Sequence, residues 1–155
     1  RALAPLGALT IVAGTMATAA SPHSGGFTGQ HVHRLTFKGP DTLSWAVHQH
    51  ATIAAVFGIA VIGVWFLRRR RGASAAELEP LTVLGVLLAA QGLIGSVQYE
   101  LRLPTDMVWV HVSLATVTWL VVLWAWAAEG SLVPPRVAVQ AQEPNVAAQR
   151  KLEAV

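Results

Sequence analysis

The stretch HQHATIAAVFGIAVIGVWFLRRRR, residues 48–71, decides the fold. No charged side chain interrupts it between His50 and Arg68, and four arginines close it. An apolar run of this kind has about the ~20 residues that a helix needs to cross the hydrocarbon core of a bilayer. Because the run is continuously apolar rather than alternating, it favours a helix over a strand of a membrane barrel. The sequence therefore predicts a membrane-spanning helix that ends at a basic cluster.

Three other stretches have the same character, so the chain has four predicted spans at residues 2–20, 43–67, 80–98 and 107–128. The 155 residues are 54% hydrophobic and only 12% charged, whereas about a quarter of a soluble domain is charged. We expect an all-α fold, a four-helix transmembrane bundle that forms one membrane domain over 1–128. The segment 129–155 is rich in Pro, Gln and Ala and is expected to be a disordered cytoplasmic tail.

The basic character of the chain, with a pI near 10.2, has a simple source in the cluster Arg68–Arg71. A basic run beside a span marks the cytoplasmic side of the membrane, so we expect no nucleic acid partner. This rule places both termini in the cytoplasm and the loops 21–42 and 99–106 outside, in a multi-pass protein of a prokaryotic plasma membrane. The chain has no cysteine, which excludes disulfides and thiolate ligands within it.

Two histidines are expected at similar depth in two different spans. His50 follows Thr42, the expected start of its helix, by eight residues, and His111 follows Thr105 by six. At ~1.5 Å per residue, the imidazoles lie about 12 and 9 Å along helices that both start at the outer face. Two histidines at matched depth in a four-helix bundle favour axial ligation of a haem from both sides.

Other interpretations of this histidine pair stay open at this point. An intramembrane histidine can hydrogen-bond across helices without a cofactor, or serve in a proton relay or a metal site. Zinc is less expected, because no carboxylate, cysteine or third histidine shares that depth. His48 points roughly 200° away from His50 around the helix, so we expect His50 to face the bundle and His48 to face the interface or the outer loop.

The surroundings of the pair are expected to be small and weakly polar. Gly85, Gly92 and Gly95 are spaced to share a face of the third span, and small residues of the first span would also make room for a macrocycle. Gln91 and Gln98 add polar groups to the third span. At the outer side, His23 is a candidate lid or haem-edge contact, whereas Arg34 and Arg102 are candidate partners of haem propionates.

Three segments together resemble a known family. They are GTMATAASPHSGG at the end of the first span, HQHATIAAVFG in the second, and GLIGSVQYELRLPTDMVWVHVSLA linking the last two. In this order they are similar to the carboxy-terminal half of haem A synthase, and the resemblance covers roughly residues 5–128.

The resemblance implies two four-helix halves in a complete enzyme, each with a histidine pair on its second and fourth helices. In the family, the amino-terminal half oxidises a methyl group of haem O to the formyl group of haem A, a cofactor of cytochrome oxidase. The carboxy-terminal half holds a haem b for electron transfer. Carried over, His50 and His111 are the axial ligands, and the metal ligands, of that haem b.

This chain departs from the substrate half of the family. Val47 stands one helical turn before His50, where that half has a carboxylate, and no acid lies inside a predicted span. We therefore expect the chain to belong to an oxidoreductase without being catalytic alone, so no catalytic residue is assigned. We expect either a fragment, whose partner is the missing amino-terminal half, or a half-size subunit that pairs with a second copy. The alternatives are a stand-alone bis-histidine cytochrome b that serves a quinone or reductase, and a cofactor-free membrane partner.

Overall fold

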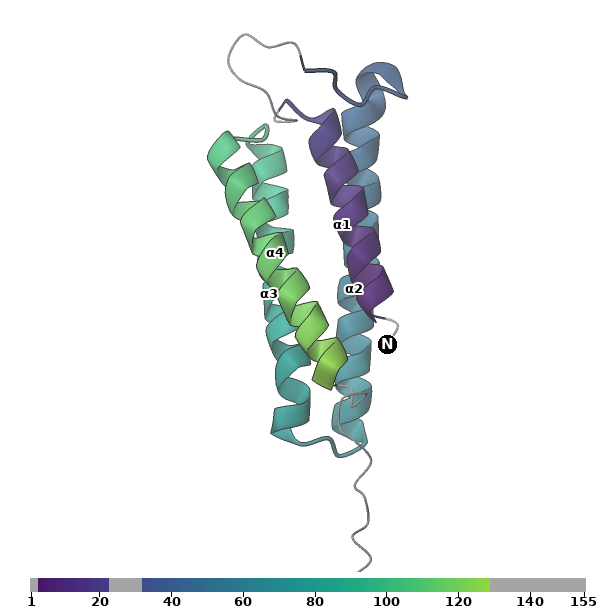
Figure 1. Ribbon diagram of the computed structural model, residues 1–155, viewed down its shortest axis with the longest axis vertical. Coiled ribbons are helices and arrows are strands. Elements are labelled where there is room, and N and C mark those ends of the chain that lie inside the picture. Colours follow the sequence, from purple (N-terminus) through teal and green to yellow (C-terminus); the bar gives the residue numbers. More distant parts are fainter. Residues whose placement is uncertain (1–2, 23–31, 129–155) are drawn as a thin grey trace, which may run out of the picture.

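The computed structural model describes residues 3–22 and 32–128, and within these ranges the chain is all-helical. The four long helices are α1 (Leu3–Ala20), α2 (Thr42–Arg70), α3 (Ala75–Glu100) and α4 (Thr105–Ala128), and a short 3-10 turn, η1 (Gly39–Asp41), leads into α2. They run up and down as a bundle (Figure 1). The predicted fold class is confirmed.

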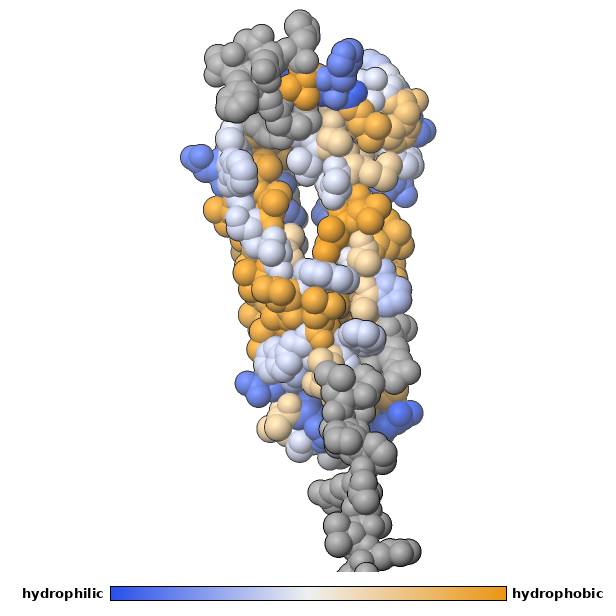
Figure 2. Space-filling model, in the orientation of Figure 1, coloured by the Kyte–Doolittle hydropathy of each residue, from blue (hydrophilic) through white to orange (hydrophobic). Residues whose placement is uncertain are grey.

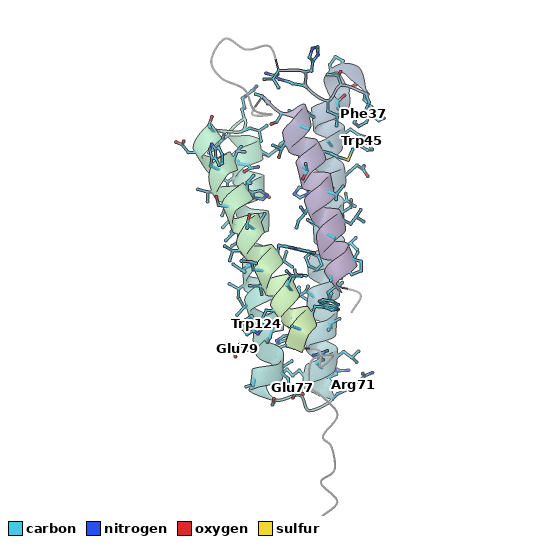
Figure 3. All side chains as sticks on the ribbon, in the orientation of Figure 1. Phe37, Trp45, Arg71, Glu77, Glu79 and Trp124 are labelled. Atoms are coloured by element: carbon cyan, nitrogen blue, oxygen red, sulfur yellow. The ribbon has the colours of Figure 1, made fainter. Side chains whose placement is uncertain are left out.

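Each long helix is apolar and long enough to cross a membrane, which is the pattern of a multi-pass membrane protein. Large apolar side chains face outward from it, for example Ile59 at 70% exposed and Leu93 at 67% exposed. Such exposure is costly in water but suits contact with lipid tails, which are as apolar as these side chains. Trp45 and Trp124 lie toward opposite ends of the bundle (Figure 3), as expected for side chains that prefer the two membrane interfaces.

The four helices form two hairpins, α1 with α2 and α3 with α4, and the hairpins meet closely at one end only. We call this the arginine end, because α2 finishes there with Arg68, Arg69 and Arg70. The buried core lies toward this end and consists of Leu3, Phe57, Val61, Leu81, Leu84, Val122 and Ala125. Toward the opposite end, where α2 and α4 begin, the hairpins diverge (Figure 1). We call that the histidine end.

The third helix begins earlier than its apolar stretch predicts. It starts at Ala75 rather than at Pro80, and Pro80 lies inside it. Ser74 caps the helix, because its hydroxyl accepts from the backbone N–H of Glu77 while the Glu77 carboxylate accepts from the backbone N–H of Ser74. This capping box satisfies backbone donors of the first turn, which extends the helix beyond its apolar residues to the arginine end.

Candidate functional site: a histidine pair in the slot between the hairpins

The diverging hairpins leave a slot between them toward the histidine end, seen in the space-filling view (Figure 2). His50 from α2 and His111 from α4 face each other across this region, one from each hairpin. Both side chains are partly buried. The expected juxtaposition of the two histidines is confirmed, whereas ligation by them stays a prediction.

The His50 ring is held by the backbone of the neighbouring helix. Its Nδ1 lies 3.1 Å from the carbonyl oxygen of Thr10 in α1. A carbonyl oxygen can only accept, so Nδ1 must carry the proton and donate it. In the neutral imidazole this leaves Nε2 with a free lone pair. A ring nitrogen that donates to a backbone carbonyl is the usual support of a metal-binding histidine, because the bond fixes both tautomer and orientation.

The His111 ring has a different partner, the side-chain amide of Gln91 on α3. In the orientation that satisfies its neighbours, the amide nitrogen donates to Nδ1 of His111 at 2.9 Å and approaches the His111 carbonyl oxygen at 3.3 Å. The amide oxygen accepts from the backbone N–H of Ala115 at 2.7 Å. The two histidines are therefore supported in unequal ways, one by a fixed acceptor and one by a donor.

Two glycines make room for the rings. A Cβ atom at Gly14 of α1 would lie 3.0 Å from Cε1 of His50, and one at Gly95 of α3 would lie 3.2 Å from Cε1 of His111. Separations this short are closer than ordinary van der Waals contact between carbon atoms. Each ring therefore lies directly on the backbone of the other helix in its own hairpin. A larger residue in place of either glycine would occupy the space of the ring.

The separation of the rings distinguishes direct contact from a shared metal ion. Their centroids are 6.3 Å apart, and their planes are inclined at 82°. An N–H···N hydrogen bond of about 2.9 Å would bring the centroids to about 5 Å, because each nitrogen lies about 1.1 Å from its centroid. Two bonds of about 2.0 Å from opposite sides of one metal would hold the centroids about 6 Å apart, whereas a tetrahedral angle between them would give about 5 Å. The observed separation is too long for the first arrangement and close to the second.

One polar atom near the pair has no partner of its own. The side-chain oxygen of Gln98 is buried and accepts no hydrogen bond. Gln98 follows Gly95 by three residues on α3, so it lies on the same helix face, one turn closer to the histidine end. Buried polar atoms are rarely left without a hydrogen-bond partner. The unsatisfied oxygen of Gln98 is therefore consistent with a slot that receives a ligand with hydrogen-bonding groups at its edge.

The remaining predicted residues are placed as follows. His48 is exposed, and its Nδ1 lies 2.7 Å from the Ser44 carbonyl oxygen of its own helix, so it is turned away from the pair as expected. Arg34 and Arg102 are exposed in the segments that precede α2 and α4 at the histidine end, and neither is brought into contact with the pair. His23 lies outside the described residues.

Of the three glycines predicted to share a face of the third span, Gly95 alone is placed against one of the two rings. Gly95 lies against His111, but a Cβ atom at Gly85 or Gly92 would meet nothing within 4 Å. Sequence reasoning also missed Thr10, because its contribution is a backbone carbonyl that any residue at that position would offer.

Over residues 3–22 and 32–128, the fold and the site define an all-helical protein with four helices that could span a membrane and a paired-histidine centre between two helical hairpins. Comparison of the chain with family models, with curated proteins and with solved structures finds no match.

Proposed function

We propose that this chain is a haem-b-binding membrane domain, corresponding to the carboxy-terminal half of a haem A synthase. The observation that carries the proposal is the pair His50 and His111, whose centroids are 6.3 Å apart across the slot. The Nδ1–H of His50 is committed to the Thr10 carbonyl, so its Nε2 is ready to bind a metal.

The donor set favours haem over a free metal ion. Among the described residues, no third His, Asp or Glu joins the pair in a group that could hold a metal ion. Haem would bring four nitrogen donors of its own to the iron, so His50 and His111 would be enough to hold it. Gly14 and Gly95 keep the two rings back against the helices, which leaves the space between the hairpins for a flat macrocycle.

When bound, a bis-histidine haem b supplies one-electron transfer through its iron. His50 and His111 would hold the iron, and the buried core would exclude water from the arginine end, where it closes the bundle. Arg34 and Arg102 precede α2 and α4 at the histidine end, where their guanidinium groups could bind propionates by charge-assisted hydrogen bonds. A haem-edge contact by His23 remains part of the proposal.

In a complete haem A synthase, this domain would support the oxidation of haem O to haem A carried out by the other half. No carboxylate flanks His50 within one turn, since Val47 stands there, so the proposal assigns electron transfer to this chain and methyl oxidation to its partner. That partner is an amino-terminal half or a second copy. A stand-alone cytochrome b would use the same pair, and a preceding four-span half with its own histidines would distinguish the two functions.

Reconstitution of the purified chain with haem b in detergent tests the proposal directly. We expect one haem per chain and a low-spin spectrum with a sharp Soret band, because two imidazole ligands saturate the iron. Haem in the same detergent without protein is the control. A spectrum that is indistinguishable from this control, or a high-spin spectrum, would overturn the proposal.

The proposed membrane orientation is testable separately, because the chain has no cysteine of its own. We propose that the histidine end is outside and the arginine end and both termini are cytoplasmic. A His33→Cys variant should react with a membrane-impermeant maleimide in intact cells, since His33 is exposed in the segment that leads into α2 at the histidine end. Ala76 is exposed in the first turn of α3 at the arginine end, so Ala76→Cys should react only after permeabilisation. The opposite labelling pattern would refute this orientation.

A further inference from the structure

The two histidines of the pair differ in which ring nitrogen is left free. At His50, the Thr10 carbonyl requires the proton on Nδ1. At His111, the Gln91 amide nitrogen donates to Nδ1, so Nδ1 must be bare and a neutral ring carries its proton on Nε2. His50 thus offers Nε2 as a ligand, whereas His111 keeps Nε2 protonated.

The backbone of α4 determines which way the Gln91 amide faces. The His111 carbonyl oxygen can only accept and the Ala115 N–H can only donate, and they lie 3.3 Å and 2.7 Å from the two ends of the amide. Turning the amide over would set its nitrogen against the Ala115 N–H and its oxygen against the His111 carbonyl. Both contacts would be repulsive, so the amide orientation does not depend on the state of the imidazole.

We propose that Gln91 is a positioning residue that disfavours the ligating tautomer of His111 and makes His111 the weaker, displaceable ligand of the pair. This inference rests on the proposed function for its consequence, but the tautomer itself is a property of the chain. Binding through Nε2 of a neutral His111 requires the proton on Nδ1, and Gln91 must then turn its oxygen to the ring against the backbone of α4. His50 needs no such change, so the two axial bonds have unequal strength.

The tautomers can be read from 15N spectra of the haem-free chain labelled at histidine, because protonated and bare ring nitrogens differ in chemical shift. We expect a bare Nδ1 at His111 and a protonated Nδ1 at His50. Signals are assigned by their loss in His111→Ala and His50→Ala. A Gln91→Glu variant offers acceptor oxygens to the ring and should move the His111 proton to Nδ1, whereas Gln91→Leu should leave the two tautomers mixed.

The matched control is Gln49→Glu, which makes the same change at an exposed position beside His50. It should leave the tautomer of His111 as it is in the parent chain. A protonated Nδ1 at His111 in the parent chain would overturn the inference. So would the same His111 spectrum in Gln91→Glu and Gln49→Glu.

With haem b added, Gln91→Glu should bind it about 10-fold more tightly than the parent chain, the lower end of the effect of a ligand's hydrogen-bond partner on metal affinity. Carbon monoxide, which must displace an axial ligand from the reduced haem, should bind Gln91→Glu more slowly. If Gln91→Glu and the parent chain bind haem with equal affinity and carbon monoxide at equal rates, the proposal that His111 is the displaceable ligand is refuted. If the parent chain takes up no haem while the tautomers are as expected, the proposed function fails and the tautomer assignment stands.

Discussion

Replacing His111 by alanine is expected to abolish the low-spin spectrum of the haem-loaded chain. The imidazole supplies one of the two axial nitrogens in the proposal, and alanine leaves the iron with His50 alone. Five-coordinate haem with one imidazole is high-spin, so the Soret band should shift and broaden, or haem should be lost altogether. The measurement is an absorption and electron paramagnetic resonance titration of the purified variant with haem b.

Replacing His50 should have the same spectral consequence but a greater loss of affinity, because its Nε2 is already free through the bond from Nδ1 to Thr10. The matched control is His48→Ala, which removes an exposed imidazole two residues away and should retain the bis-histidine spectrum. Loss of the low-spin signal in His48→Ala, with its retention in His50→Ala, would show that the wrong histidine of the second helix is assigned.

Closing the slot with a side chain at either glycine is the second change with a large expected effect. In Gly14→Val, the new Cβ would lie 3.0 Å from Cε1 of His50, and in Gly95→Val it would lie 3.2 Å from Cε1 of His111. The rings would have to move toward each other, into the space proposed for the macrocycle. Haem affinity should fall at least as much as on loss of a ligand's hydrogen-bond partner, about 10- to 100-fold.

Gly92→Val is the control for this experiment, because Gly92 is exposed and a Cβ atom there would touch neither ring. It adds the same side chain to the same helix as Gly95→Val and should leave haem affinity unchanged. Circular dichroism of the haem-free variants should show that all three remain helical. Full haem affinity in both Gly14→Val and Gly95→Val would place the binding site away from this slot.

The sequence alone determined the number of helices, the membrane class and the matched depth of the histidines. These follow from apolar length and from the rise of a helix per residue, both of which are local properties. Helix ends were less well determined, because capping depends on polar residues outside the apolar run. Ser74 and Glu77 extend the third helix beyond the stretch that hydrophobicity alone marks.

Only the tertiary structure decided how each helix is rotated about its axis. In water, an apolar stripe would reveal the inward face of a helix, but a span in lipid is apolar all round and carries little such signal. For this reason the sequence could not separate Gly95, which lies against His111, from Gly85 and Gly92, which meet nothing. The unequal partners of the two rings, a carbonyl from α1 and an amide from α3, exist only because packing brings distant helices to one depth and one face.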